Sequence, residues 1–432
     1  MKQLIYAVLL LPLLGSINIA AEEPDSHSST STITWQECVD KAMTNNPTLI
    51  AKRLAVEQGK YNFRENSSLN AYIDGLSLTH SYKYGGDYIS EGHDTWSTSA
   101  LSLSETIYSK SVQASVKSSE LSYKNAEIAY KVSSASLRKD LYSAFMTLLI
   151  AQEEIKVNQK VVEMREENAN LLKLKYESGK ESRGNMMYAV AQEKQAKVSL
   201  AESERAKESA ARDLLKILGE DYRPVSASAD LAVPELNFDT STIKGIIENV
   251  PSILSQKNTI NIKKSSLDSA KADYYPTLTA SQSYGGDSES YEFPHSWNSW
   301  SVGLSLNIPI MPGGPTKYKN SVKSAEAAVK AEKQNLADDK LTLESNVYSA
   351  YDDFINACET VYAGDALLAA NEERYKESFI NYMAGNISFI DLESIEQTLI
   401  ESRRNQLSYL KNANVNKITL ESLLGITLEE GK

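Results

Sequence analysis

Side chains that commonly carry out chemistry are few in this sequence and lie far apart. The histidines are His27, His80, His93 and His295, and the cysteines are Cys38 and Cys358. None is spaced as a metal-binding pair, and the sequence has no phosphate-binding loop, dinucleotide-binding, nucleophile-elbow or zinc-protease motif. We therefore predict no enzyme activity, no metal and no cofactor, and we expect both cysteines to be small buried residues.

Composition limits the partners and the fold class. The formal net charge of −12, without a cluster of Lys and Arg, disfavours a nucleic-acid partner, because phosphate binding needs such clusters. The 432 residues include only 19 Gly and 11 Pro, well below the average combined share of about 12 %. A chain with so few turn-forming residues is expected to form mainly long helices.

Residues 1–21 have the pattern of a secretory signal peptide. Lys2 precedes the apolar run of residues 4–14, and small residues follow up to a cleavage site expected near Ala20 or Ala21. The run is too short to span a bilayer, and no later stretch of about 18 apolar residues could do so as a helix. We expect an exported chain whose charge, without Lys2, is −13; a buried N-terminal helix is the alternative.

The rest of the sequence is a tandem duplication. Tyr176-Glu-Ser-Gly179 recurs as Tyr382-Met-Ala-Gly385, and two further motifs recur at the same offset of 206 residues. Repeats of this kind decide the architecture before single elements are assigned. We predict a first structural repeat over residues 22–219, a linker over 220–238, a second repeat over 239–425 and a C-terminal tail over 426–432.

Each repeat contains one predicted β-hairpin, over residues 71–108 and 276–310. Apolar side chains alternate with small or polar ones, as in Leu76 and Leu78 of the first hairpin and in the run from Trp300 to Ile310 of the second. Trp96 is out of phase with Leu101, which indicates a bulge or a different strand boundary. The patterns predict four strands in all.

A long helical hairpin follows each β-hairpin, over residues 112–219 and 318–425. Apolar residues recur every seven positions from Leu141 to Tyr176, and again from Val347 to Tyr382. This spacing predicts helices that supercoil around their neighbours. The first helix of each hairpin would be roughly 100 Å long and would end near Gly179 or Gly385. Shorter helices are expected to begin at Thr34, with a capping-box pattern, and at Asp239.

Four strands with one apolar face can neither bury that face nor close their edges alone. Outer-membrane strands alternate in this way and close into barrels of at least about eight strands, so three chains with twelve strands would solve the problem. Aromatic residues near the strand ends fit the girdles of such a barrel; they are Tyr72, Tyr82, Tyr84, Trp96, Tyr284, Trp297 and Trp300. The alternative is that they form the core of a soluble sheet.

The sequence resembles the TolC-like outer membrane efflux proteins over nearly all of the expected mature chain. The resemblance rests on the duplication, on Ala272-Asp-Tyr-Tyr-Pro-Thr-Leu278, on the second hairpin with the following Pro312-Gly-Gly, and on the two Tyr-x-x-Gly motifs. It implies a mainly α fold with a transmembrane β-barrel: a homotrimer with a twelve-stranded barrel, a long periplasmic α-helical barrel and a small mixed equatorial region.

The resemblance also implies a function, a location and partners. The protein would lie in the cell outer membrane with a long periplasmic extension. It would be the exit duct of a tripartite efflux pump or type I secretion system, carrying small molecules or proteins. Its partners would be outer-membrane lipid, a periplasmic adaptor and an inner-membrane pump of RND or ABC type. Gly179, Lys180, Gly385 and Asn386, at the helical tips, would contact the adaptor; the glycines could also be simple turn residues.

The same resemblance assigns a periplasmic constriction to the tips. Asp391 occupies the position of an acid that lines it, and Tyr382 matches a tyrosine that helps to hold the tip closed. Three copies of Asp391 would form a ring, and carboxylate rings bind or select cations. Two positions depart from the family pattern, because Ser394 and Asn185 stand where acids are expected. Asp391 could instead be a solvated carboxylate at a helix N-terminus.

A second function class also accommodates the helices and the export signal. In that alternative the chain is a non-conducting, exported coiled-coil spacer or adaptor of the periplasm. It leaves the two duplicated amphipathic hairpins without a role.

Overall fold

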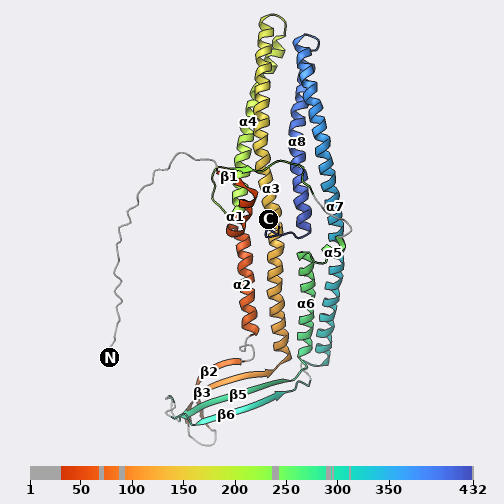
Figure 1. Cartoon of the computed structure of the whole chain (residues 1–432). Coiled ribbons are helices and arrows are strands. Elements are labelled where there is room, and N and C mark those ends of the chain that lie inside the picture. The colour runs from red at the N-terminus through yellow and green to blue at the C-terminus, as the bar shows by residue number, and fades with distance from the viewer. Residues whose placement is uncertain are drawn as a thin grey trace, which may run out of the picture.

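The computed structural model describes residues 31–67, 73–86, 93–235, 243–288, 293, 296–310 and 313–430. The expected signal peptide, Asp239, Tyr72, His27 and His295 lie outside these ranges. The chain is mainly helical and elongated (Figure 1). A sheet lies at one end, and the turns that join α3 to α4 and α7 to α8 lie at the other. The helices are α1 (Trp35–Asn45), α2 (Pro47–Ser67), α3 (Lys110–Glu177), α4 (Arg183–Leu218), α5 (Ile243–Ile247), α6 (Pro251–Ala272), α7 (Pro315–Met383) and α8 (Phe389–Leu423).

The two longest helices confirm the predicted lengths. Helix α3 has 68 residues and α7 has 69, which at 1.5 Å per residue is roughly 100 Å each. The heptad residues Leu141, Leu148, Val347 and Val361 are fully buried. Helix α4 returns along α3 and α8 returns along α7, while α3 and α8 join the two hairpins. The seam between α3 and α8 therefore connects the two repeats in the half of the molecule that is opposite the sheet (Figure 1).

The four predicted strands form one antiparallel sheet in the order β2–β3–β5–β6. The strands are β2 (Ile73–Gly86), β3 (His93–Tyr108), β5 (Thr277–Ser288) and β6 (Ser299–Asn307). Register shifts lie between Ile73 and Gly75 and between Thr106 and Tyr108, not between Trp96 and Leu101. Trp96 pairs with Lys83 in a regular ladder that begins at His93, so the alternation of a continuous strand, and not a bulge, puts Trp96 out of phase with Leu101. The second hairpin also ends earlier than predicted, at Asn307, because Pro309 has no N–H to donate to the ladder.

The two faces of this sheet differ in chemistry. One face carries large apolar side chains that are exposed in the single chain; they are Leu76, Leu78, Tyr82, Leu101, Tyr284, Trp300, Val302, Leu304 and Leu306. The other face carries hydroxyl groups in cross-strand rows, such as Ser77, Ser102, Ser283 and Ser301. Among the described residues, both edge strands, β2 and β6, lack a second partner.

Two short strands were not predicted. Strand β1 (Ser31–Thr34) pairs in parallel with β4 (Val225–Ser228), so the described chain has six strands instead of four. Four-residue strands are too short to show a clear alternation. They lie beside the main core at mid-height, where Trp35 packs edge-on against Tyr142 and the fully buried Cys38 contributes to the same cluster.

Helix ends follow the sequence signals. The Thr34 side chain accepts from the Glu37 N–H and Glu37 reaches back to the Thr34 N–H, which confirms the capping box. Gly219 follows α4 with φ of 72°, and a Cβ there would lie 2.4 Å from the Asn45 carbonyl oxygen. Its repeat equivalent, Gly425, approaches Pro251 at the start of α6 in the same way. Glycine is therefore required at both of these joints.

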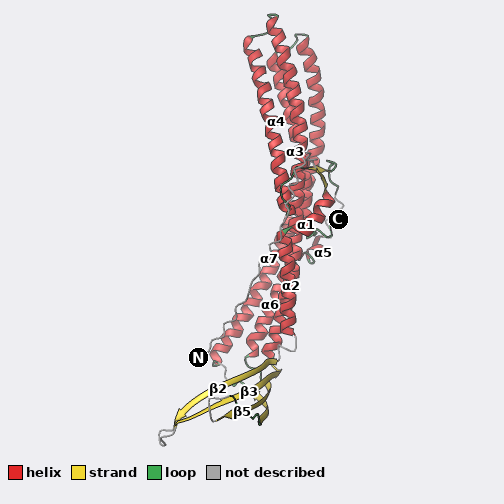
Figure 2. Cartoon of the chain, turned by 90° about the vertical axis from the view of Figure 1, so that its left-hand side faces the viewer, coloured by secondary structure: helices red, strands yellow, loops and turns green. Residues whose placement is uncertain are grey.

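Figure 2 shows the strands at one end of the helical layer. Among the residues that the structure describes, no helix combines the length and apolar composition needed to cross a membrane.

Candidate functional site

The candidate site is the pair of turns at the end of the molecule opposite the sheet. Gly179 and Gly385, which follow α3 and α7, adopt φ of 72° and 81° and are exposed. Lys180 and Asn386, the next residues, are also exposed. The two turns are equivalent in the repeat, and a serine, Ser182 or Ser388, caps the helix that follows each of them.

Asp391 lies in the first turn of α8 and is exposed. Its carboxylate accepts the Ser388 hydroxyl at 2.7 Å and the Ser388 N–H at 3.2 Å, while its own N–H donates to Ser388 Oγ. The hydrogen bonds from Ser388 hold the pKa of Asp391 below its usual value. Asp391 is therefore an ionised capping residue within its own chain, and one carboxylate can serve both as a cap and as an exposed charge at the tip.

The two positions that depart from the family pattern have different surroundings. Ser394 is exposed on α8, one turn after Asp391. Asn185 is half-buried, and its side-chain amide donates to Glu181 Oε1 at 2.8 Å. Asn185 thus positions the carboxylate of Glu181 in the α3–α4 turn. By the family resemblance, an acidic residue is expected at position 185 itself.

Tyr382 is the buried centre of the tip. This residue of α7 packs in a cluster with Leu172 of α3, Ala189 of α4, and Phe389 and Leu392 of α8. Only 3 % of Tyr382 is exposed. The side chain therefore joins the α3–α4 hairpin to the α7–α8 hairpin.

Two charged residues that the sequence did not single out contact Tyr382. The Tyr382 hydroxyl donates to Glu181 Oε2 at 3.3 Å, and Lys175 Nζ lies 3.5 Å from the centre of the Tyr382 ring while donating to its carbonyl oxygen. Burial, with the negative charge of Glu181, raises the pKa of Tyr382 to about 12. Burial also lowers the pKa of Lys175. For Glu181, hydrogen bonds from Ser182, Asn185 and Tyr382 outweigh burial and lower the pKa.

Some of the aromatic residues predicted to form girdles belong to the described part of the chain. These lie toward the end of the sheet that is farther from the helices. Tyr82, Tyr284 and Trp300 are exposed on the apolar face. The Tyr284 hydroxyl donates to the Trp297 carbonyl oxygen at 2.7 Å, and the two rings lie 5.7 Å apart. Tyr84 and Trp96 belong to β2 and β3, and their side chains, like the whole of Tyr72, lie outside the described part.

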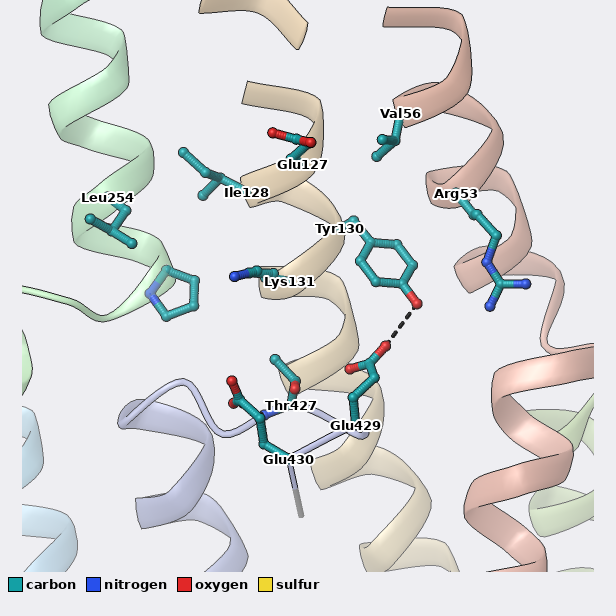
Figure 3. Close-up of a pocket in the computed structure, with 11 residues that line it drawn as sticks. Arg53, Val56, Glu127, Ile128, Tyr130, Lys131, Leu254, Thr427, Glu429 and Glu430 are labelled. Atoms are coloured by element: carbon teal, nitrogen blue, oxygen red, sulfur yellow. Dashed lines mark hydrogen bonds between the residues drawn. The ribbon is translucent and has the colours of Figure 1, made fainter. Parts of the chain in front are cut away.

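Of the histidine and cysteine side chains, His80 lies in the sheet and Cys38 in the core around α1. His80 Nδ1 lies 2.6 Å from Ser99 Oγ within the sheet, and burial raises the pKa of Cys38 to about 12. No group of three or more metal-ligating side chains occurs among the described residues. A cavity of about 680 Å³ lies between α2, α3, α6 and the C-terminal segment (Figure 3). Its Glu429 accepts hydrogen bonds from Tyr130 and Ser134, which indicates a structural role.

Comparison with known proteins gives one consistent result. The outer membrane efflux protein family matches residues 38–220 and again residues 242–426. The cobalt-zinc-cadmium resistance protein CzcC of Cupriavidus metallidurans is 21 % identical over 297 residues, which cover 67 % of this chain and 68 % of CzcC.

Solved structures share the fold. The CmeC outer membrane channel of Campylobacter jejuni aligns with a TM-score of 0.79 and 17 % identity over 90 % of this chain and 85 % of CmeC. The open state of the MtrE outer membrane channel of Neisseria gonorrhoeae aligns with a TM-score of 0.77 and 18 % identity over 90 % of this chain and 88 % of MtrE. Because the family matches both repeats and most of the sequence, this chain belongs to the outer membrane efflux protein family.

Proposed function

We propose that three copies of this chain form an outer-membrane exit duct, and that the duct serves a tripartite efflux pump or a type I secretion system. The observation that carries the proposal is the two-faced sheet. Its large apolar side chains are exposed in the single chain, with Trp300 76 % exposed and Leu304 73 %. Lipid on that side and water on the hydroxyl side would satisfy both faces.

Closure of the sheet requires other chains. Within the part of the chain that the structure describes, strands β2 and β6 are free edges, and a four-stranded sheet is too small to close on itself. Three chains would supply a twelve-stranded barrel. The edge helix α7 supports the same assembly, since Leu341, Tyr348 and Tyr362 recur on a heptad spacing and are all exposed. A neighbouring copy would cover this stripe and continue the helical layer into a tube.

The tips are the proposed contact with a periplasmic adaptor, through Gly179, Lys180, Gly385 and Asn386. Several apolar side chains near these turns are exposed in the single chain; they are Leu174, Met187, Tyr188, Ile380, Met383 and Ile390. Apolar groups of this kind commonly mark interaction sites. The proposed constriction consists of Asp391 and Tyr382 with Ser394 and Asn185, and in a trimer Asp391 would occur three times around the axis. No enzymatic step is proposed, and the energy for transport would come from the inner-membrane pump.

The experiment combines localisation, assembly and conductance. We expect the full-length chain to appear in the outer-membrane fraction as a heat-modifiable trimer, and the purified trimer to form channels in planar lipid bilayers. A soluble periplasmic monomer would contradict the proposal and favour the non-conducting spacer. Crosslinking from cysteines placed at positions 180 and 386, with Cys358 replaced by serine, would identify the adaptor.

A further inference from the structure

A charged cluster is buried in the α3–α8 seam, below the tips. Glu396 of α8 has no exposed surface, and Arg165 of α3 is only 4 % exposed. Arg165 Nε lies 2.9 Å from Glu396 Oε1, and Asn168 Nδ2 lies 2.5 Å from Glu396 Oε2. Removing charges from water in this way is costly unless every polar atom is paired. The cluster therefore sits where the two hairpins join and where its pairing affects their packing.

The pairing of the cluster is incomplete when Glu396 is ionised. Although Arg165 lies close to Glu396 Oε1, that oxygen has no hydrogen bond of ordinary geometry in the described part, and neither has Asn168 Oδ1. A half-turn of the Asn168 amide would place Oδ1 toward a protonated Glu396. A proton on Glu396 Oε2 would then be donated to Asn168 Oδ1, which otherwise has no hydrogen bond among the described residues.

The groups around Glu396 come from three helices. The charged and titratable ones are Arg165 of α3, Tyr375 of α7 and Glu393 of α8, and Glu167 of α3 acts on Tyr375. Burial raises the pKa of Glu396 to about 7, with a further increase from Glu393 and opposing effects of Arg165 and Asn168. Burial, with the negative charge of Glu396, raises the pKa of Tyr375 to about 12. Glu396 is therefore placed to change its protonation near neutral pH.

We propose that the α3–α8 seam is a proton-sensitive contact, in which Glu396 holds a proton while the hairpins are packed and releases it when they separate. The sign follows from the pKa of Glu396, which is higher in the packed seam than its ordinary value of 4.5. The stabilisation is complete below about pH 4.5 and is lost as the pH rises through about 7. Between pH 6 and pH 8 the equilibrium for separating the seam should increase about tenfold.

This contact lies between the hairpins whose turns form the tips. If the proposed duct is correct, a looser seam at higher pH would ease movement of the α7–α8 hairpin away from α3. Only this consequence rests on the proposed function, since proton binding at the seam depends on the fold alone. The test therefore measures the seam directly and needs no conductance.

The experiment is hydrogen–deuterium exchange of the purified full-length chain at pH 6 and pH 8, corrected for the intrinsic pH dependence of exchange. We expect peptides covering residues 160–172 and 390–402 to lose protection about tenfold at pH 8. Glu396→Gln, which keeps the shape of the protonated side chain, should remove this dependence. Glu393→Gln, a control one turn away on the same helix, should retain it.

A second variant guards against a misfolded Glu396→Gln protein. Arg165→Gln removes a cation that lowers the pKa of Glu396, so the midpoint of the protection loss should move to a pH above about 7. Equal protection of the wild-type seam at pH 6 and pH 8 would overturn the proposal. An unchanged pH dependence in Glu396→Gln would do the same.

Discussion

Tyr382 and Asp391 lie near each other in sequence but have opposite surroundings in the folded chain. Tyr382 is buried between the hairpins and contacts Glu181 and Lys175, whereas Asp391 is exposed and caps its own helix. Both positions could be found from the repeat and the family resemblance. Glu181 and Lys175 could not, because they reach Tyr382 only after the hairpins have packed.

The buried Glu396 had a weaker signal in the sequence. At the 206-residue offset its equivalent is Val190, so a charged residue replaces an apolar one at a matched position. Such a difference between repeats marks a site where the two copies have diverged. It does not identify Arg165 as the partner, because the equivalent of Arg165 is Asn371 and the pairing crosses from one repeat to the other.

A prediction at the residue scale separates the charge of Asp391 from its role as a cap. If three copies form a cation-binding ring, Asp391→Asn should weaken block of the channel by divalent cations at least tenfold. Ser388→Ala removes the capping hydroxyl but leaves the charge, so block should persist. The lowered pKa of Asp391 means that block by the wild-type channel should also persist at pH 5. Single-channel recordings with varied divalent cation concentrations measure all of these, and equal block in wild type and Asp391→Asn would exclude the ring.

At the scale of elements, the length of a helix or strand and the regular spacing of its apolar residues decided whether it could be predicted from the sequence. The long helices and the four sheet strands repeat their patterns many times, so the sequence specifies their type and approximate bounds. Strands β1 and β4 have four residues each and were missed. They are held by pairing with each other and by the core around α1, and neither contact is visible in a local pattern.

The glycines that join elements give a prediction at this scale. Gly219→Ala should destabilise the chain strongly for two reasons. The alanine would have to adopt a positive φ, and its Cβ would lie 2.4 Å from the Asn45 carbonyl oxygen. Gly179→Ala has a similar φ but open space around it, so it should cost only about 1–2 kcal/mol. Thermal unfolding followed by circular dichroism should give a larger decrease in Tm for Gly219→Ala. Equal decreases would mean that the close approach to Asn45 does not constrain the joint.

At the scale of the whole molecule, duplication produces a layer with two unfinished boundaries. In the described residues the sheet has free edges at β2 and β6, and the helical layer has an exposed apolar stripe on α7. A single chain can neither pair the open strand edges nor cover the apolar stripe. For this reason the sequence predicts an assembly of several chains. The hydroxyl face of the sheet also predicts how the sheet would be oriented in a barrel, because water would occupy that side.

The two faces of β6 allow a test with neighbouring residues. Val302 lies on the apolar face and Ser301 on the hydroxyl face, and both are exposed in the single chain. An arginine facing lipid near the middle of a membrane costs about 2–4 kcal/mol, whereas one facing an aqueous lumen costs little. Val302→Arg should therefore greatly reduce the heat-modifiable trimer in the outer membrane, while Ser301→Arg should insert normally and shift the channel toward anion selectivity. Because the two variants add the same charge one residue apart, a difference between them reports which face meets lipid; normal insertion of Val302→Arg with loss of Ser301→Arg would reverse the assignment of the faces.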